Sequence, residues 1–343
     1  MQYIAEKIIV WHKSSGRHDL PWQKTQDPYR IWISEIMLQQ TQVSSVIPYF
    51  KKFIKEFPTV DKLASADEDL VMRHWSGLGY YRRAKFILQT AKIIVDSYQS
   101  KFPINVDELI NLPGIGKSTA GAICAFAFGG IEPIMDANVK RVFCRFYGIR
   151  EWSGKAKTQK YLWNLAHENL PSKDIKIYTQ ALMDLGATIC KGKQPDCLNC
   201  PLQKKCESFK LNLCQVIPAK KPKKTIPTKQ VNVLIVEVND QILLKKRREA
   251  SVWEGLWSLP EIQEFSYIEK WLQDLWGATP FNLVKQGQHL AIFSHYKLQI
   301  NFNYIVLTER INKNTPRDFL WVNRAELSNA GIPTPIKRLL RDI

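Results

Sequence analysis

This sequence has no apolar run long enough to cross a lipid bilayer. Its longest one, residues 120–131, falls short of the roughly 20 residues that a spanning helix needs and is interrupted by glycines. The N-terminus also lacks the apolar core of a signal peptide, because Glu6, Lys7 and Lys13 lie among its hydrophobic residues. These absences predict a soluble, cytoplasmic protein without a membrane partner.

Acidic residues are scarce relative to basic ones. The chain has 49 Lys and Arg against 32 Asp and Glu, a net charge of +17. The excess is +10 over residues 1–214, +5 over residues 215–230 and only +2 over residues 231–343. This distribution indicates a polyanionic partner, and nucleic acid is favoured because no lysine-rich amphipathic helix points to a membrane surface. Charge alone also fits a merely soluble basic protein.

Apolar patterning divides the chain into two domains and a linker. Residues 1–214 have apolar side chains at three- and four-residue spacing, which predicts an all-α domain. Residues 215–230 hold three prolines and five lysines and predict an exposed, extended linker. Residues 231–343 predict an α+β domain. The expected elements are helices over 31–53, 67–74, 83–95 and 267–276, a hairpin over 231–244 that turns at Asn239-Asp240, and two strands within 292–307.

Four cysteines cluster near the end of the first domain. Cys190, Cys197, Cys200 and Cys206 are separated by six, two and five residues. In a cytoplasmic chain such a cluster binds metal more often than it forms disulfides. Zinc usually takes two separated cysteine pairs, whereas an iron–sulfur cluster tolerates uneven spacing. The cysteines alone leave both a zinc knuckle and an iron–sulfur cluster open.

A glycine-containing turn lies between an amphipathic segment, residues 106–111, and an apolar helix, residues 120–128. Its sequence is Leu-Pro-Gly-Ile-Gly-Lys-Ser-Thr, residues 112–119. The free N–H groups at the start of the second helix, with Lys117 beside them, can bind an anion. The turn matches neither the dinucleotide-binding nor the nucleoside-triphosphate glycine pattern. Taken alone, it is equally an ordinary tight turn.

Several motifs together resemble a known family. The four-cysteine spacing and the Leu-Pro-Gly-Ile-Gly turn resemble the endonuclease III superfamily of helix-hairpin-helix DNA glycosylases. Residues 32–42 (WISEIMLQQTQ), 77–81 (GLGYY) and 135–142 (MDANVKRV) are similar to the MutY-type adenine DNA glycosylases within it. The resemblance runs from about Trp11 to the C-terminus. One position departs from it, because Ala137 stands where many relatives have glycine.

The resemblance implies two catalytic carboxylates. Glu35 matches the general acid that protonates adenine as its bond to the sugar breaks, and Asp136 matches the carboxylate that faces the cation-like sugar. Ser118 stands where relatives that also nick DNA have a Schiff-base lysine. A hydroxyl cannot form that imine, which implies a monofunctional enzyme. Outside its motif, Glu35 would be taken for an ordinary exposed helix residue.

The resemblance also assigns the contacts to DNA and the cofactor. Gln40 and Tyr80 match residues that wedge into the duplex where the target nucleotide flips out, although Tyr80 also fits a plain core aromatic. Gly114, Gly116 and Lys117 would hold phosphates. The cysteines at 190, 197, 200 and 206 would bind a [4Fe-4S] cluster.

The second domain resembles a Nudix fold through residues 253–260 (WEGLWSLP). A Nudix hydrolase needs an Arg-Glu pair and clustered glutamates to hold magnesium, yet no arginine lies between Glu249 and Glu309. The resemblance therefore implies the fold without its chemistry. Phe293, Ser294 and His295 match a loop that recognises 8-oxoguanine opposite the adenine. A buried Phe followed by a turn Ser-His is the plainer alternative.

The leading hypothesis is a monomeric, monofunctional base excision repair enzyme. It would hydrolyse adenine from double-stranded DNA that carries an adenine:8-oxoguanine or adenine:guanine mismatch. One alternative is a bifunctional endonuclease III-type glycosylase acting on pyrimidine lesions, against which Ser118 and the extra domain argue. Another is a redox-sensing DNA-binding protein without activity, against which the presence of both Glu35 and Asp136 in their motifs argues.

Overall fold

A computed structural model of the chain describes residues 3–222, 226–247, 253–277, 279–293, 296–308, 315–327 and 330–343. The chain divides into two units, one formed by Met1–Ser65 with Gln89–Lys223 and the other by Ala66–Leu88 with Lys224–Ile343. The sequence-based division at residues 215–230 instead kept residues 66–88 with the first domain. None of the helices among the described residues is long and apolar enough to cross a membrane.

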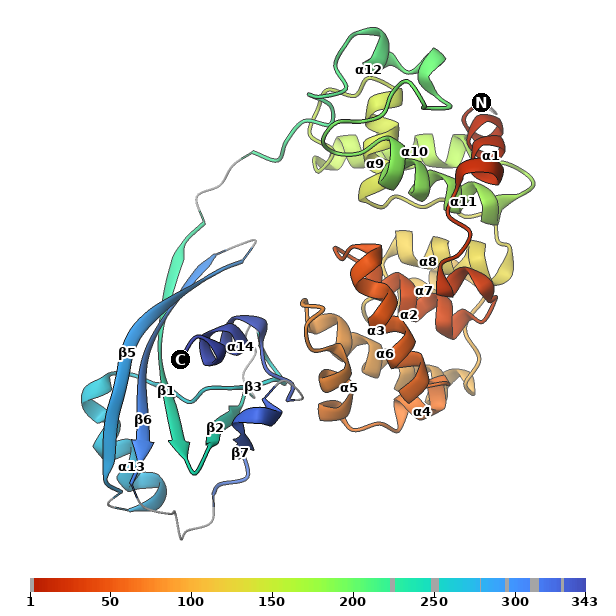
Figure 1. Cartoon of the computed structure of the whole chain (residues 1–343). Coiled ribbons are helices and arrows are strands. Elements are labelled where there is room, and N and C mark those ends of the chain that lie inside the picture. The colour runs from red at the N-terminus through yellow and green to blue at the C-terminus, as the bar shows by residue number, and fades with distance from the viewer. Residues whose placement is uncertain are drawn as a thin grey trace. The chain divides into compact units, whose positions relative to one another are not determined.

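The first unit is helical, as the apolar spacing predicted, and forms two lobes (Figure 1). Its helices are α1 (Tyr3–Ser15), α2 (Pro28–Leu38), α3 (Val43–Glu56), α4 (Val60–Ala64), α7 (Val106–Ile110), α8 (Lys117–Ile123), α9 (Ala137–Phe146), α10 (Ala156–Glu168), α11 (Ile175–Asp184) and α12 (Glu207–Lys210), together with most of α6 (Arg82–Tyr98). In one lobe α2 packs on α3 and α8, and in the other α11 packs on α1 and α9.

Two predicted helices differ from those observed. The segment predicted as one helix over residues 31–53 is two helices, α2 and α3, because Gln40 between them takes a left-handed conformation with φ 56°. Helix α8 begins earlier than residue 120 and continues into a π-helical turn, Cys124–Phe128. Gly121 in α8 is required by a close approach, because a Cβ there would lie 2.4 Å from the carbonyl oxygen of Pro133.

The predicted linker is partly ordered against the first unit. Ile217 is 3% exposed and belongs to the hydrophobic core that α1, α9 and α11 share. The buried Arg145 guanidinium donates a hydrogen bond from Nε to the Ile217 carbonyl oxygen at 2.7 Å. The first strand of the other unit begins at Thr228. The extended connection is therefore shorter than the composition of residues 215–230 predicted.

The second unit contains a mixed β-sheet, helices α13 (Ile268–Trp276) and α14 (Thr334–Arg341), and α5 (Glu68–Trp75). The strands are β1 (Thr228–Val238), β2 (Gln241–Lys246), β3 (Trp257–Ser258), β4 (Glu261–Ile262), β5 (Phe281–Ile292), β6 (Lys297–Leu307) and β7 (Phe319–Asn323). The strand order in the sheet is β3-β2-β1-β6-β5, and the neighbouring strands β1 and β6 are parallel. Outside this order, β4 pairs with β1 and β7 pairs with β2. Helix α13 packs on the core through Leu272 and Trp276.

The predicted hairpin is confirmed, and one strand was missed. Asn239 and Asp240 have φ values of 47° and 59°, which suit the tight turn that joins β1 to β2. Residues 292–307 were expected to hold two strands but contain only one complete strand, β6, because Ile292 is the last residue of the long strand β5. Polar residues such as Lys285 and Gln288 hide β5 from an analysis of apolar alternation.

Candidate active site

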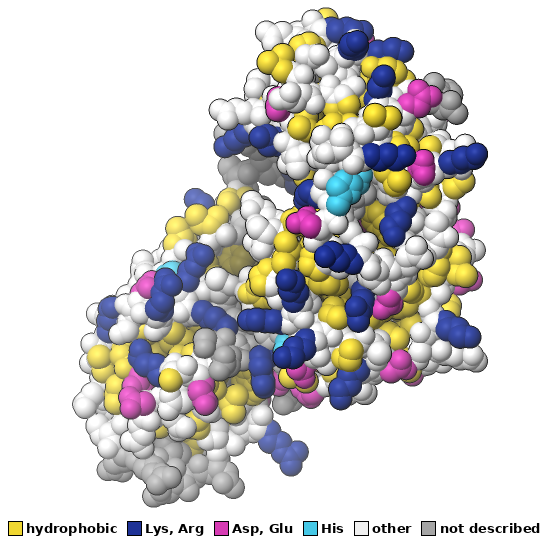
Figure 2. Space-filling model, turned by 45° about the vertical axis from the view of Figure 1, so that its right-hand side comes forward, with side chains coloured by type: hydrophobic (Ala, Val, Ile, Leu, Met, Phe, Trp, Pro, Cys, Tyr) yellow, Lys and Arg dark blue, Asp and Glu magenta, His cyan; other side chains and the backbone are white. Residues whose placement is uncertain are grey.

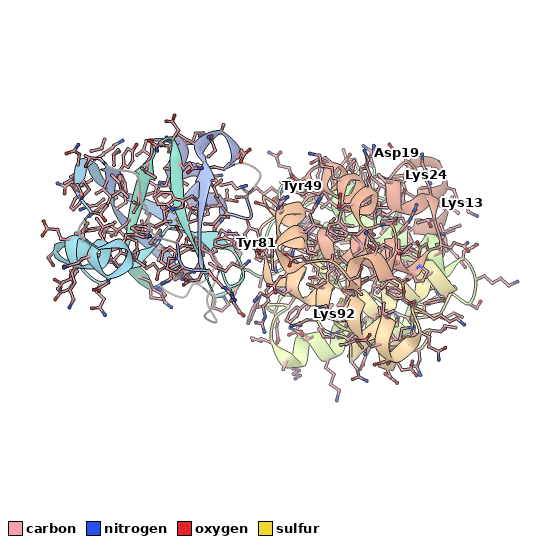
Figure 3. The ribbon with its side chains drawn as sticks, turned by 90° about the horizontal axis from the view of Figure 1, so that it is seen from below. Lys13, Asp19, Lys24, Tyr49, Tyr81 and Lys92 are labelled. Carbon is pink, nitrogen blue, oxygen red and sulfur yellow. The ribbon has the colours of Figure 1, made fainter. Side chains whose placement is uncertain are left out.

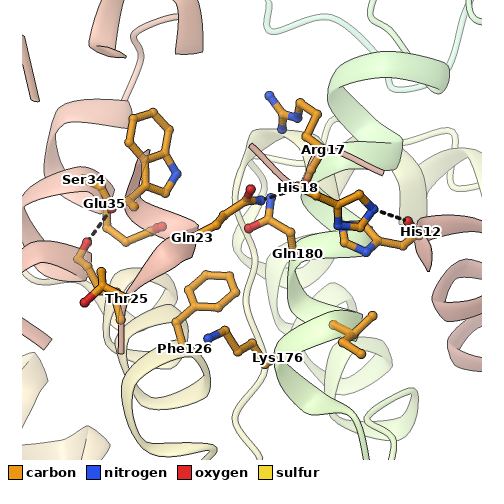
Figure 4. Close-up of a pocket in the computed structure, with 13 residues that line it drawn as sticks. His12, Arg17, His18, Gln23, Thr25, Ser34, Glu35, Phe126, Lys176 and Gln180 are labelled. Carbon is orange, nitrogen blue, oxygen red and sulfur yellow. Dashed lines mark hydrogen bonds between the residues drawn. The ribbon is translucent and has the colours of Figure 1, made fainter. Parts of the chain in front are cut away.

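A pocket lies between the two helical lobes of the first unit (Figure 4). Glu35 and Ser34 of α2 line one side, and Arg17 and His12 line the other. Gln180 of α11 also faces the pocket. The remaining lining residues are His18, Trp22, Gln23, Thr25, Ile31, Phe126, Lys176 and Ile177. Most of these lining residues are polar or charged, and Trp22, Ile31, Phe126 and Ile177 supply the apolar and aromatic surface.

Glu35 projects from the last part of α2, a helix whose start is well defined by its sequence. Asp27 caps it by accepting a hydrogen bond from the backbone N–H of Tyr29 at 3.0 Å, and Pro28 occupies the first turn. Burial, and to a smaller extent the nearby negative charge of Asp136, together raise the pKa of Glu35 to about 8. Glu35 therefore holds its proton at neutral pH.

Asp136 occupies the N-cap position of α9. Its Oδ1 accepts a hydrogen bond from the backbone N–H of Val139 at 2.7 Å, and its Oδ2 accepts one from Nδ2 of Asn138 at 3.1 Å. Burial raises the pKa of Asp136, whereas these bonds and the positive charge of Arg141 lower it. On balance the pKa of Asp136 is raised, because burial outweighs these donors. The donors nevertheless favour its anion, whereas both influences on Glu35 favour the neutral acid, so the proton of the pair is favoured on Glu35.

Ser118 connects the glycine turn to the segment that carries Asp136. Its Oγ accepts a hydrogen bond at 2.9 Å from the backbone N–H of Met135, the residue directly before Asp136. The hydroxyl thus helps to fix the start of α9. Asp136 lies near enough to Glu35 to raise its pKa, and Ser118 bonds to the residue before Asp136, although only Glu35 of the three lines the pocket.

The wall opposite Glu35 is anchored by a fully buried carboxylate. Asp184 accepts hydrogen bonds from the backbone N–H of Arg17 at 2.8 Å, from its Nε at 2.9 Å and from Nε2 of Gln180 at 2.8 Å. Nε2 of His12 lies 3.2 Å from Asp184. These donors hold the pKa of Asp184 below its usual value in spite of burial. Sequence reasoning missed this network, because Arg17 and Asp184 are 167 residues apart in the chain.

Replacing Asp184 with Asn should destabilise the first unit by about 3 kcal/mol at pH 7, because Arg17 would lose its charged partner in a buried setting. The carboxylate has a lowered pKa, so its contribution is complete above the unfolded-state pKa of about 4 and is lost as the pH falls further. The difference between wild type and variant should therefore shrink in acid. Urea unfolding followed by far-UV circular dichroism at several pH values measures it.

Asp19→Asn provides the matched control for this prediction. Asp19 lies two residues from Arg17, the partner of Asp184, but is exposed, and Figure 3 shows it at the outer edge of the first unit. Its substitution should change the unfolding free energy by less than about 0.5 kcal/mol. Equal stabilities of Asp184→Asn and wild type at pH 7 would contradict the anchoring role.

The two predicted wedge residues have strained backbones. Gln40 is exposed with φ 56°, and Tyr80, in the other unit, is 49% exposed with φ 50°. A left-handed conformation costs a non-glycine residue about 1–2 kcal/mol, and such strain is common at functional sites. The Arg83 guanidinium lies 5.3 Å from the Tyr80 ring centroid. Tyr80 is therefore not the core aromatic that the alternative interpretation proposed.

The glycine turn joins α7 to α8 as a helix-hairpin-helix. Gly114 has φ 78°, which only glycine adopts readily, whereas Gly116 is the N-cap of α8 with φ −90°. Nζ of Lys117 lies 4.5 Å from the ring centroid of Trp163. This lysine packs over an aromatic face at the start of α8 and is exposed there.

The four clustered cysteines line one small hollow. Cys190, Cys197, Cys200 and Cys206 surround it together with Cys214 and Arg145. Arg145 is 2% exposed and donates hydrogen bonds from Nη1 to the Cys190 Sγ at 3.3 Å and to the Lys191 carbonyl at 2.7 Å. Among the residues the structure describes, no three His, Cys, Asp or Glu side chains converge closely enough to hold a single metal ion.

The loop predicted to recognise a base is only partly described. Phe293 is half-buried, and its backbone N–H donates a hydrogen bond to the Tyr296 carbonyl. The centroid of its ring lies 4.9 Å from the Tyr296 ring centroid and 6.0 Å from the Trp253 ring centroid. Ser294 and His295 lie outside the described residues. Phe293 thus belongs to an aromatic group at the ends of β5 and β6.

Comparison with known proteins identifies the family. Residues 33–168 match the HhH-GPD superfamily of base excision DNA repair proteins, and residues 231–342 match the NUDIX domain. An adenine DNA glycosylase from Buchnera aphidicola subsp. Baizongia pistaciae is 38% identical over 98% of this chain and 96% of its own length. This chain belongs to the adenine DNA glycosylase family. It is therefore a DNA glycosylase enzyme of base excision repair, as the motifs predicted.

More distant relatives and solved structures agree with this assignment. Human adenine DNA glycosylase is 28% identical to this glycosylase over 97% of this chain and 72% of its own. The solved structure of a thermostable thymine-DNA glycosylase superposes on 61% of this chain, over 95% of that glycosylase's own length, with a TM-score of 0.56 and 28% sequence identity. A non-covalent endonuclease III–DNA complex, at 21% identity and TM-score 0.53, covers 62% of this chain and 95% of its own and shares the helical fold.

Proposed function

We propose that this glycosylase hydrolyses the bond between adenine and deoxyribose in double-stranded DNA, opposite 8-oxoguanine or guanine. The observation that carries the proposal is the carboxylate pair of the first unit, in which burial keeps Glu35 protonated at neutral pH and Asp136 accepts two hydrogen bonds that favour its anion. Curated relatives named adenine DNA glycosylase, with up to 38% identity over nearly the whole chain, support the choice of base.

The mechanism follows from the different surroundings of the two carboxylates. A flipped adenine in the pocket would accept the proton of Glu35 on a ring nitrogen as the glycosidic bond breaks, which makes the neutral base a good leaving group. The sugar becomes positively charged at the same time, and the Asp136 anion stabilises that charge. Water then completes the hydrolysis. Burial of both groups strengthens these charge interactions.

The same geometry supports a monofunctional enzyme. The Ser118 hydroxyl has no amine to form an imine with the sugar, and Lys117 next to it packs over the ring of Trp163. With duplexes carrying adenine opposite 8-oxoguanine, guanine or thymine, strand breaks should appear only after alkali or heat. Borohydride should trap no covalent complex. Efficient trapping of the wild-type chain would refute the monofunctional assignment.

Two substitutions at Ser118 separate its chemistry from its position. Ser118→Lys should introduce some borohydride trapping, because an amine would then be near the product aldehyde. Ser118→Ala removes the hydroxyl that accepts the Met135 N–H. Leaving that donor without its acceptor costs about 1–3 kcal/mol of stability, so the variant should excise adenine more slowly but should show no trapping. Trapping by the alanine variant would show that another lysine attacks the sugar.

The proposed partner is a DNA duplex, which this glycosylase would bind as a monomer in the cytoplasm. Figure 2 shows Lys and Arg side chains spread over much of the visible face, in line with the net charge of +17. Gly114, Gly116 and Lys117 would contact phosphates at the hairpin turn. Gln40 and Tyr80 would enter the duplex beside the flipped nucleotide, and their exposure and backbone strain support this role.

The proposed cofactor is a [4Fe-4S] cluster held by Cys190, Cys197, Cys200 and Cys206. The residues fit this group, because four thiols, the number of thiolates that such a cluster takes, line one hollow. The Arg145 guanidinium beside Cys190 supplies positive charge that would offset an anionic cluster. When bound, the cluster would hold the loop of residues 190–206 together.

We further propose that residues 1–214 carry catalysis and that residues 231–343, through Phe293, Ser294 and His295, inspect the base opposite adenine. A chain ending at Pro222, which keeps the buried Ile217, should still excise adenine but should lose most of its preference for 8-oxoguanine over guanine. Single-turnover rates on both duplexes measure this preference. An unchanged ratio would remove the recognition role.

Truncation also separates residues 66–88 from the rest of their unit, so a variant of the full chain is needed as control. Ser294→Ala removes one hydroxyl that could bond the altered edge of 8-oxoguanine and leaves the whole fold in place. Its preference for 8-oxoguanine should fall about 10-fold, the effect of roughly 1.4 kcal/mol from one hydrogen bond. Preference equal to wild type would contradict the role of Ser294.

A further inference from the structure

A fifth cysteine lies beside the four that the motif assigns to a cluster. Cys214 lines the same hollow as Cys190, Cys197, Cys200 and Cys206. Its thiol is in hydrogen-bond contact with Cys197, and its surroundings include Cys206. Cys214 lies eight residues beyond the last cysteine of the motif and is not part of it.

The fold holds Cys214 in this position from both sides. Leu213 packs against the hydrophobic core, and its backbone N–H bonds to the Ser208 carbonyl at 2.7 Å. Ile217 is buried in the same core, and its N–H bonds to the Leu213 carbonyl at 2.9 Å. The turn between them carries Cys214 and therefore cannot move away from the cysteine loop without breaking these contacts.

Arg145 ties this turn to the cysteine loop. Its buried guanidinium donates to the Ile217 carbonyl at 2.7 Å on one side and to the carbonyls of Lys191 at 2.7 Å and Gly192 at 3.2 Å on the other. One side chain thus fixes the segment with Cys214 against the loop with Cys190. The juxtaposition of the fifth thiol and the cluster ligands is built by the core rather than by a surface loop.

We propose that Cys214 is a reserve ligand that can replace Cys197 at the iron site. The proposal rests on the proposed [4Fe-4S] cluster. In the exchange the Cys214 thiol gives its proton to water and takes the place of the Cys197 thiolate, which accepts a proton as it leaves. No electron is transferred, so no oxidant or reductant is needed. Such an exchange would keep iron bound when Cys197 is lost to substitution or oxidation.

The experiment compares four variants purified under anaerobic conditions. Iron and acid-labile sulfide per chain and the absorbance near 400 nm are measured for Cys197→Ser and for the double variant Cys197→Ser with Cys214→Ser. The matched control is the same pair at Cys200, a position that is not among the cysteines in contact with Cys214. Wild type should contain about four irons.

Cys197→Ser should keep at least half of the wild-type iron, and the double variant should lose most of it. Cys200→Ser should lose iron whether or not Cys214 is present. Equal iron in Cys197→Ser and its double variant would overturn the reserve role. A wild-type chain that contains zinc and no iron would instead overturn the proposed cofactor, so the two failures are distinguishable.

A second measurement decides the matter if the Cys197 variants are insoluble. The full chain with Cys214→Ser retains all four motif cysteines, and its iron should be released to a chelator several-fold faster than iron from wild type. Cys124→Ala, a change at a buried cysteine in the π-helical turn, is the control and should release iron at the wild-type rate. Equal release from Cys214→Ser and wild type would overturn the proposal.

Discussion

Glu35→Gln should lower the rate of adenine excision by about 10²–10⁴-fold, the usual effect of removing a general acid. The amide has the size of the carboxyl and retains most of its hydrogen-bonding capacity, but it cannot deliver a proton to the departing base. Affinity for the mismatch should change far less, because phosphate contacts supply most of the binding free energy. Single-turnover excision and equilibrium binding on the same duplex separate the two effects.

The pH dependence gives an independent test of the same assignment. Burial raises the pKa of Glu35 to about 8, and an acid catalyst must be protonated, so kcat/KM of the wild type should fall as the pH rises through that value. The residual activity of Glu35→Gln should lack this titration. Glu6→Gln, at an exposed position of α1, should retain both the rate and the profile. Near-wild-type excision by Glu35→Gln would mean that another group is the acid.

The sequence predicted the elements of this fold wherever apolar residues repeat with one period and turn residues mark the ends. The helical first unit and the β1–β2 hairpin are examples. It failed at Gln40, where an ordinary residue adopts a left-handed conformation that splits one predicted helix into two. It also failed at β5, an edge strand with so many polar side chains that its period is hidden.

The candidate site was predictable only in part. The motifs located Glu35 and Asp136, but residue type alone does not reveal which carboxylate keeps the proton, since that depends on burial and on the donors around each. The anchoring of Arg17 by Asp184 was not predictable, because nothing in either local sequence marks a pair that meets only after folding. Cys214 does not belong to the four-cysteine motif, and its position beside those cysteines becomes visible only in the fold.

Asp136→Asn should be at least as severe as Glu35→Gln. In a closed pocket, stabilisation of developing charge is commonly the largest contribution to catalysis, and loss of one such group costs about 10²–10³-fold or more. The asparagine side-chain oxygen can still accept the hydrogen bond from the Val139 N–H, so α9 should keep its N-cap and the protein its stability. Only the negative charge beside the sugar is removed.

A second aspartate in the same unit is the control for that substitution. Asp27 is also an N-cap, of α2, and accepts a hydrogen bond from the Tyr29 N–H in the same manner. Asp27→Asn makes the same chemical change at a helix start and should leave the excision rate within a few-fold of wild type. If Asp136→Asn excises adenine as fast as Asp27→Asn, the charge of Asp136 does not stabilise the transition state. If both are equally slow, the rate depends on negative charge at either helix start and not on its place beside the sugar, because asparagine preserves both N-caps.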